Sequence, residues 1–522
     1  MTEEQDRVSG LRGDWGLMSS RIVDTPPTAF SGGTGLVVLD GVGLGVADVV
    51  RLADGAARPV PGSEAMRRVE ESWDAARQIA ATGRVYGRST GVGANRNEDV
   101  PTEAAAEHGL RLLRSHAGAI GEELPAREVR AMLAVRANQL LAGGAGLRPT
   151  VVTALCEALE SGAHPVVNEF GSVGTGDIAA LAQAGLALAG EHPWREPGAP
   201  KPLQLDNNDA LAFISSNALT LGQAALALHE LRGLVQATQV VAALSLLAVD
   251  GSHEAYAAPV HAARPHRGSS EVARQMRELI GAADRPTPPL GRIQDPYGFR
   301  CLPQIHGPAL DAADDLEEVV AIEINAAAEN PLISPEDMAA YHHGGFYQAQ
   351  LALALDHFRL SLTQVARLST SRLSTLNEPA FTRLRPFLAD EVPASSGVMI
   401  LEYAAGAALG DLRAFSAPAS LGHAVLSRGV EEQASFASLA ARQTLRACRA
   451  YRLVVGCELV AAVRALRQRY LRPDPDLPVG RAQELAESVL AEDQTDRPLT
   501  DDVTAAAALL DRFTDIWRGS GS

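Results

Sequence analysis

Long stretches with helical periodicity constrain the fold of this chain more than any other feature. From Glu230 onward, apolar residues recur at the spacing of amphipathic helices, and long helices are expected within Ala210–Val249 and Leu310–Leu373. Aromatic residues make up only 4% of the chain, while alanine and leucine dominate, which favours helices over sheets. The sequence therefore predicts a mainly α protein with long, nearly parallel central helices and an interruption near Arg472–Pro475.

Composition narrows the class of protein further. The chain has 522 residues, enough for two or three domains or for one large helical assembly. A net charge of −17 argues against binding to nucleic acid or to anionic membranes. The most apolar run, near Leu234–Val249, contains polar residues, so we expect a core helix rather than a membrane span. No secretory signal is visible, and a cytoplasmic location is the default expectation.

Cysteine and metal-ligand patterns give little sign of cross-links or metal. The four cysteines are sparse and form no CxxC pair, which indicates a reducing compartment without a disulfide framework. We expect each to be a small buried apolar residue: Cys156, Cys301, Cys448 and Cys457. No convergent set of His, Cys, Asp and Glu side chains stands out as a metal site.

The chain divides into three parts by composition. Residues 1–34 are polar and aperiodic, and we expect a disordered extension. We assign 35–208 to an N-terminal domain, beginning with a short strand at Gly35–Asp40 and a helix capped by Ser63. We assign 209–522 to the central and C-terminal helical bundle.

Two glycine-rich loops lie in the N-terminal part. Gly171–Asp177 reads GSVGTGD and runs directly into an apolar helical segment. Glycines in that position indicate either a tight turn, with Asp177 as helix cap, or a close approach of the backbone to a ligand. Arg84–Gly93 places three glycines around Tyr86, which by itself fits a surface turn with one packed tyrosine.

Taken in order, these motifs resemble the histidine/aromatic amino acid ammonia-lyase family. Gly171–Asp177 resembles the family's G-S-V-G-A-S-G-D, and Arg84–Gly93 contains its Y-G-x-x-T-G-x-G. Gln294–Gln304 reads QDPYGFRCLPQ, close to Q-D-x-Y-S-x-R-C-x-P-Q. The resemblance extends over roughly Gly35–Leu510, and no P-loop, HExxH, GxSxG or dinucleotide motif competes with it. It implies the fumarase/aspartase-like helical superfamily and a homotetramer whose sites combine loops from several subunits.

The resemblance assigns the first loop to an electrophile. In the family, Ala-Ser-Gly cyclises into methylidene-imidazolone (MIO), and an asparagine further on supports it. Here Gly174, Thr175 and Gly176 take that place in a loop one residue shorter, and Ser215 takes the place of the asparagine. A hydroxyl cannot give the paired donor and acceptor of a carboxamide. Asn217 lies two residues beyond Ser215, so we do not assign it the same role and keep it, like Ser215, as a candidate substrate-binding residue.

The resemblance also assigns the remaining site residues. The family's catalytic base matches Tyr86, for which Arg88 and Arg300 are candidates to lower the pKa. Arg300, beside Gln294, matches the residue that binds the substrate carboxylate, and Tyr297 matches a tyrosine near the amine. Further substrate contacts are expected from residues that taken alone could equally be ordinary helix or loop residues: His116, Phe346 and Glu431.

Two explanations of the altered loop remain open. In the first, Thr175 still dehydrates, giving an ethylidene group crowded by its extra methyl. In the second, no prosthetic group forms, and the pocket performs elimination, cyclisation or binding without turnover on an amino acid or derivative. We expect no normal MIO and no external cofactor. We also expect catalysis rather than binding alone, because Tyr86, Tyr297 and Arg300 are all retained.

Overall fold

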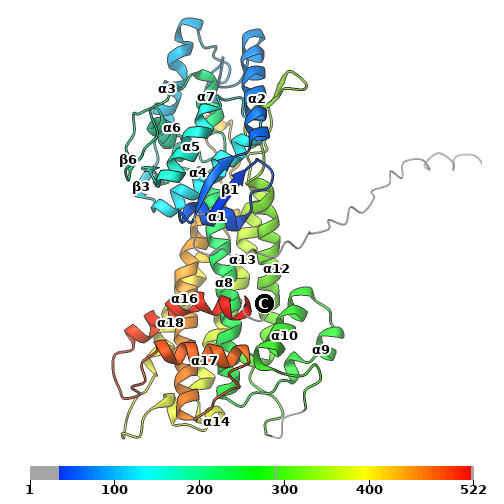
Figure 1. The fold of residues 1–522 in the computed structure, drawn as a ribbon, viewed down its shortest axis with the longest axis vertical. Helices are drawn as coiled ribbons and strands as arrows, with labels where there is room; N and C mark the ends of the chain where they lie inside the picture. Colours follow the sequence, from blue (N-terminus) through cyan, green and yellow to red (C-terminus); the bar gives the residue numbers. More distant parts are fainter. Residues whose placement is uncertain (1–34, 288–290, 519–522) are drawn as a thin grey trace, which may run out of the picture.

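Long helices form the centre of the molecule. The computed structural model describes residues 35–287 and 291–518, so the extension predicted at 1–34 lies outside the described residues. The central helices run side by side along the long axis in Figure 1: α8 (Ala218–Ala248), α12 (Leu302–Glu323), α13 (Ala349–Leu376) and α16 (Ala437–Gln468). This arrangement confirms the prediction of a mainly α protein with a long helical core.

Helix α8 is the innermost of these helices. Its alanine- and leucine-rich sequence is buried along nearly its whole length, as expected for a helix that is apolar on every side. The segment Asn207–Ala248 is long and apolar enough to cross a membrane by length and composition, but 94% of its most apolar window is buried inside the protein. It therefore packs as a core helix, as predicted for Leu234–Val249.

The N-terminal elements gather at one end of the central helices. Strand β1 (Gly35–Leu39) pairs in parallel with β2 (Ala57–Pro61) across α1 (Val46–Ala53), which confirms the predicted strand. Helix α4 (Ala126–Leu141) is almost wholly buried and packs against both α1 and α8. These contacts join the N-terminal elements firmly to the central core.

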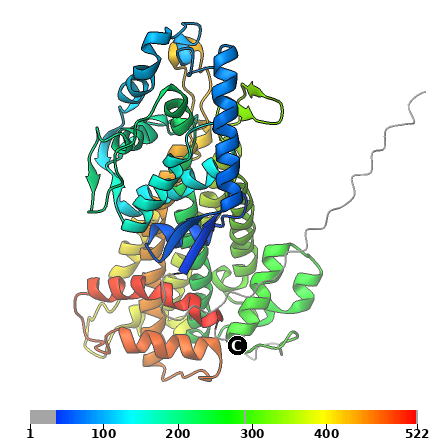
Figure 2. The ribbon, with the colours of Figure 1, turned by 45° about the horizontal axis from the view of Figure 1, so that its top comes forward.

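The hairpin of β7 (Leu332–Ser334) and β8 (Ala339–Tyr341) corrects the helix expected over Leu310–Leu373. Pro331 and Pro335 lie in this stretch, and a proline in a helix interior removes a backbone hydrogen bond and kinks or ends the helix. Figure 2 shows the hairpin beside α2 (Ser63–Thr82), and the two are in contact. The hairpin carries the chain back to the end of the molecule where the glycine loops lie.

Neither predicted cap, Ser63 or Asp177, forms the side-chain hydrogen bond of a helix cap. Ser63 is the first residue of α2, and Gly62 occupies the N-cap position without a side-chain bond. Asp177 is the N-cap of α6 (Ile178–Leu188), but its carboxylate does not cap that helix. Instead it accepts bonds from the backbone N of Thr220 (2.7 Å) and from its hydroxyl (2.9 Å). Asp177 thus joins the glycine loop to α8.

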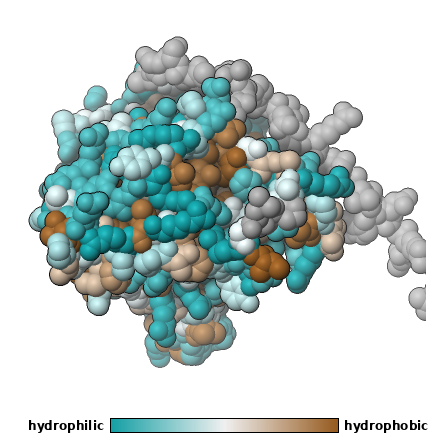
Figure 3. All heavy atoms as spheres, turned by 90° about the horizontal axis from the view of Figure 1, so that it is seen from below, coloured by the Kyte–Doolittle hydropathy of each residue, from teal (hydrophilic) through white to brown (hydrophobic). Residues whose placement is uncertain are grey.

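The remaining elements surround this core. Helix α16 ends at Gln468 and the next helix begins at Pro478, which confirms the interruption predicted near Arg472–Pro475. Three cysteines are buried as predicted, while Cys301 is only partly buried. Seen from below, the surface is mostly hydrophilic with smaller apolar groups (Figure 3). The other helices and strands are α3 (Ala105–His116), β3 (Ile120–Glu123), α5 (Thr150–Ser161), β4 (His164–Pro165), β5 (Asn168–Phe170), β6 (Trp194–Arg195), α7 (Asn207–Ile214), α9 (Ala258–Ala262), α10 (Arg267–Ile280), α11 (Tyr297–Arg300), α14 (Pro379–Thr382), α15 (Ile400–Phe415), α17 (Pro478–Val489) and α18 (Thr500–Arg518).

Candidate active site

A pocket of about 570 Å³ lies where the two glycine loops meet the hairpin and the start of α16. Six predicted site residues line it: Tyr86, Thr175, Gly176, Ser215, Phe346 and Glu431. Residues that the sequence did not single out complete the wall: Gly93, Arg96, Ile178, Leu211, Ser216, Asn330, His342, Tyr347, Val430, Glu432 and Gln433. The pocket therefore combines a phenol, further rings and carboxylates in one cavity.

Tyr86 is held in the pocket wall by its own loop. The backbone N of Gly93 donates to the Tyr86 hydroxyl at 2.8 Å. Burial raises the pKa of Tyr86, and the Glu431 carboxylate raises it further. The Gly93 amide and the Arg96 guanidinium act in the opposite direction, because both favour the ionised phenol. The Arg96 guanidinium is thus a nearby cation that favours ionisation of Tyr86.

Arg88 does not face Tyr86, although the sequence suggested that it would lower the tyrosine pKa. Its guanidinium donates instead to the carbonyls of Gly146 (3.0 Å) and Ala145 (2.6 Å). The side chain is buried, and this burial lowers the pKa of Arg88 to about 10. Arg88 therefore anchors the tyrosine loop to the segment that follows α4.

The residues before α16 hold the Gly171–Asp177 loop. The Ser435 hydroxyl donates to the carbonyl of Gly174 at 2.6 Å, and the backbone N of Phe436 donates to the carbonyl of Val173 at 2.8 Å. Gly174 has φ +88°, in the left-handed region that favours glycine. An added Cβ there would also lie 2.2 Å from the Ser435 hydroxyl oxygen. Only glycine fits this close approach.

Asn217 reaches the loop from the N-terminus of α8. Its side-chain oxygen accepts a bond from the backbone N of Gly176 at 2.9 Å, and its side-chain nitrogen donates to the carbonyl of Phe346 at 2.8 Å. The Gly176 carbonyl accepts a bond from the Ser172 hydroxyl at 3.1 Å. A carboxamide therefore supports Gly176, although it lies two residues beyond the position that the family motif indicates.

Ser215 lies in the pocket wall, but its hydroxyl bonds to a residue outside the glycine loop. Its hydroxyl accepts a bond from the backbone N of Asn330 at 3.0 Å. The Asn330 side chain in turn accepts a bond from the backbone N of His343 at 2.9 Å. Ser215 thus helps to fix the chain around the hairpin that brings His342 into the pocket. The His342 ring meets the Tyr86 ring edge-on, with 6.4 Å between centroids.

The predicted carboxylate-binding residues lie elsewhere in the chain. Gln294, Tyr297 and Arg300 are not in the pocket wall. Asn217, which contacts the glycine loop, precedes the N-terminus of α8, whereas Asp295 bonds to the backbone N of Ser252 just beyond its C-terminus. A helix of 31 residues is about 46 Å long. Within one copy of the chain, Tyr86 and Arg300 therefore cannot hold the same small substrate.

Tyr297 and Arg300 form an outward-facing pair. The Tyr297 side chain is 65% exposed, and the Arg300 guanidinium lies over its ring at 4.4 Å from the centroid. His116, at the C-terminus of α3, also lies outside the pocket wall. Its Nδ1 contacts the Leu112 carbonyl oxygen at 2.9 Å and the Ser115 hydroxyl at 3.0 Å.

Comparison with known proteins finds relatives that match most of the chain. A family model described as Aromatic amino acid lyase matches residues 44–490. A histidine ammonia-lyase of Geobacillus thermodenitrificans is 33% identical over 91% of this chain and 97% of the relative. The tyrosine aminomutase of Streptomyces globisporus superposes with a TM-score of 0.86 at 25% identity, over 92% and 98% of the two chains. Ergothionase, an ergothioneine-degrading enzyme of Treponema denticola, gives a TM-score of 0.85 at 26% identity, over 92% and 99%.

Proposed function

Because this chain belongs to the aromatic amino acid lyase family, we propose that it eliminates the α-nitrogen of an amino acid or derivative without the family's normal MIO. The observation that carries the proposal is the sequence of the loop: the single residue Thr175 stands between Gly174 and Gly176, and Thr175 and Gly176 line the same pocket as Tyr86. The chain is a carbon–nitrogen lyase-like enzyme. The proposal concerns how the nitrogen leaves the substrate without a normal MIO.

The residues at 174–176 fit a normal MIO poorly. Ring closure would join the backbone N of Gly176 to the carbonyl carbon of Gly174. The backbone N of Gly176 donates to Asn217, and the carbonyl of Gly174 accepts a bond from Ser435. Thr175 adds a methyl group at the carbon that would become electrophilic, and the loop is one residue short of the family motif. No step of the mechanism is therefore assigned to that group.

Tyr86 supplies the base in this proposal. Its ionised oxygen takes the β-proton of the substrate, the C–H electrons form the Cα–Cβ double bond, and the nitrogen leaves with the electrons of the Cα–N bond. Arg96 and the Gly93 amide favour the phenolate that this step needs. Glu431 lines the same pocket and suits a positively charged nitrogen. The product is an α,β-unsaturated acid.

A quaternary α-ammonium group is the substrate feature that best fits such a site. A trimethylated nitrogen leaves as a neutral amine without help from an electrophile. The rings of Tyr86, Phe346 and Tyr347 line the pocket together with Glu431, and aromatic faces attract quaternary ammonium ions. One structural neighbour is an ergothioneine-degrading enzyme, and ergothioneine is a betaine of this kind.

We further propose a homotetramer in the cytoplasm, in which Tyr297 and Arg300 of one copy complete the pocket of another. The length of α8 supports this, because it separates the two groups within a single chain. Large apolar side chains on neighbouring helices also support it, since contiguous exposed apolar surface marks association sites. Those most exposed on α12, α13 and α15 are Ile322, Leu353, Leu360, Ile400 and Tyr403.

One mass measurement and one assay test the proposal. We expect the peptide that contains Gly171–Asp177 to have its unmodified mass, and the protein to lack a near-ultraviolet chromophore. A deficit of two waters in that peptide would overturn the proposal and restore the ordinary ammonia-lyase reaction. We expect N,N,N-trimethyl-L-histidine to release trimethylamine and free histidine, tyrosine or phenylalanine to release little or no ammonia. The same assay with Tyr86→Phe separates catalysis in this pocket from background elimination.

A further inference from the structure

We propose that three side chains, Tyr256, Arg372 and Asp295, are positioning residues that hold Tyr297 and Arg300 in place for the substrate carboxylate. The inference rests on the proposed function, in which Tyr297 and Arg300 complete the pocket of another copy, and on the resemblance that assigns the substrate carboxylate to Arg300. None of the three faces the pocket beside Tyr86. Each instead fixes the backbone of the short segment that carries Tyr297 and Arg300.

Two core side chains bind the backbone of α11 from inside. The Tyr256 hydroxyl donates to the carbonyl of Phe299 at 2.9 Å, and Nη1 of Arg372 donates to the carbonyl of Gly298 at 3.2 Å. Tyr256 and Arg372 are fully buried. Helix α11 has only four residues, so these two bonds take up half of its carbonyl groups. The segment is held from the core while Tyr297 faces outward.

Arg372, on α13, is itself held by a buried network of side chains from α8, α13 and α16. Its Nε and Nη2 bind the two carboxylate oxygens of Glu458 at 2.6 and 2.8 Å. Glu458 also accepts bonds from the hydroxyls of Ser245 (2.7 Å) and Ser369 (2.5 Å). These residues come from α8, α13 and α16 and are all fully buried. The guanidinium that contacts α11 therefore has a single defined position.

Gly298 brings α11 directly onto Arg372. A Cβ added at Gly298 would lie 2.9 Å from Cγ of Arg372, too close for a side chain without a shift of one partner. The glycine thus sets the depth at which α11 sits on the central helices. Gly298→Ala is expected to push the Tyr297–Arg300 pair outward.

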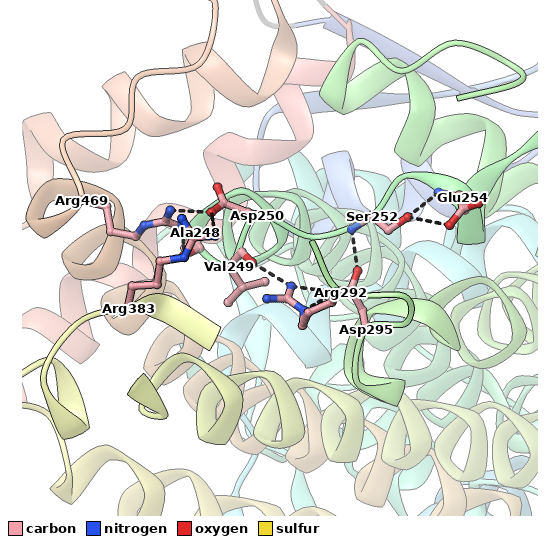
Figure 4. Close-up of polar contacts among 9 residues, drawn as sticks. All are labelled: Ala248, Val249, Asp250, Ser252, Glu254, Arg292, Asp295, Arg383 and Arg469. Atoms are coloured by element: carbon pink, nitrogen blue, oxygen red, sulfur yellow. Dashed lines mark hydrogen bonds and ion pairs between the residues drawn. The ribbon is translucent and has the colours of Figure 1, made fainter. Parts of the chain in front are cut away.

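Asp295 fixes the start of the same segment (Figure 4). Its carboxylate accepts bonds from the backbone N of Ser252 at 2.5 Å and from Arg292 at 2.7 Å. Arg292 also donates to the carbonyl of Val249, at the C-terminal end of α8, at 2.8 Å. The segment is therefore tied to the end of the helix whose other end contacts the glycine loop.

Tyr256, Arg372 and Asp295 together form a frame that holds the Arg300 segment in one position, so that its guanidinium is oriented before a ligand binds. It is stacked on Tyr297, and within the described residues its Nε has no hydrogen-bond partner. A planar guanidinium that is already oriented loses less freedom when it binds a carboxylate by two bonds. Loosening the frame should therefore weaken substrate binding without changing the proton transfer at Tyr86.

Tyr256→Phe tests the inference because it removes one hydroxyl and keeps the ring. Tyr451→Phe is the matched control: Tyr451 is also fully buried, and its hydroxyl bonds to Thr238 on α8 at 2.8 Å, not to the backbone of α11. We expect the two variants to lose similar thermal stability. We expect only Tyr256→Phe to raise the KM for the trimethylated probe, or its Kd by calorimetry, by about 3- to 10-fold with kcat nearly unchanged. Gly298→Ala should raise the same constant.

The outcomes separate this inference from the proposed function. Equal binding constants in Tyr256→Phe and Tyr451→Phe would overturn the positioning role, provided that Arg300→Lys weakens binding. An Arg300→Lys variant with unchanged binding would instead overturn the assigned role of Arg300, and the positioning role with it. If the wild-type protein binds neither the trimethylated probe nor free histidine, the proposed function and this inference both fail.

Discussion

Tyr86 must lose its proton before it can accept one from a substrate. Burial and the Glu431 carboxylate raise the pKa of Tyr86 in the single chain, and the Arg96 guanidinium is the nearby cation that opposes them. We expect Tyr86→Phe to lower kcat by about 100- to 10,000-fold, the range for loss of a general base. Unchanged circular dichroism and melting temperature would show that the fold is intact. A variant that kept most of its activity would make Tyr86 only a packed loop residue.

Arg300 is suited to a carboxylate by the shape of its side chain. Its guanidinium can offer two parallel bonds, whereas a lysine offers a point charge. We expect Arg300→Lys to weaken binding of amino-acid or carboxylate ligands by about 1.5–3 kcal/mol, the usual value of a charged hydrogen bond. Calorimetry with the full-length protein measures this directly. Arg274→Lys, at an exposed arginine of α10 that pairs with Glu271, is the comparison.

Among single residues, the sequence predicted those pocket residues that belong to a recognisable local motif. Tyr86, Thr175 and Glu431 lie in glycine loops or motifs with recognisable spacing, and all three line the pocket. Arg96 and His342 also line it but were not identified, because no local pattern marks them. His342 enters through the β7–β8 hairpin, whose position depends on packing against α2.

Among the central elements, α12 carries a histidine that should make stability depend on pH. His306 is fully buried, and burial together with the nearby Arg372 charge lowers the pKa of His306 well below its ordinary value. Below about pH 6.5 the unfolded chain binds a proton at this residue that the folded chain does not. Stability is therefore retained above that pH and falls as the pH is lowered.

We expect His306→Met to reduce this pH dependence. One proton changes the free energy of unfolding by up to about 1.4 kcal/mol per pH unit below pH 6.5, and the variant should lose this contribution. Melting temperatures between pH 7.5 and 5.5 measure it, and His266→Gln, at an exposed histidine, is the control. Parallel curves for the wild type and His306→Met would contradict the expectation.

The helices themselves were largely predictable, and their interruptions were less so. Periodicity identified the core helices, including the apolar one now seen as α8. The hairpin within Leu310–Leu373 was missed because its strands have only three residues each, too few for a period of two to stand out. Ser63 and Asp177 resembled caps, but a cap is defined by a hydrogen bond that the residue type does not determine.

At the scale of the whole molecule, the separation of Tyr86 from Arg300 predicts that inactive variants rescue each other. We expect Tyr86→Phe and Arg300→Ala chains, each inactive alone, to regain activity when co-expressed and assembled together. Sites that pair an intact pocket with an intact Arg300 should make up about one quarter of the total in a random mixture. No activity in mixed assemblies of confirmed composition would contradict shared sites.

The assembly itself is a separate prediction. We expect light scattering at micromolar concentration to give the mass of a tetramer, because association would bury the large apolar side chains that are exposed on α12, α13 and α15. A monomer at that concentration would contradict both the tetramer and the shared site. Leu353→Glu, on α13, should shift the mass toward smaller species, while the exposed His266→Gln should not.

The length of helix α8 sets the distance between the glycine loop and the arginine segment. One end is fixed to the glycine loop through Asn217, and the other is fixed to the arginine segment through Arg292 and Asp295. Adding one residue within it would move one end by about 1.5 Å and turn it by about 100° relative to the other. In an assembly of identical copies, that error would recur at every shared site. We therefore expect relatives that work in the same way to vary more in their loops than in the length of this helix.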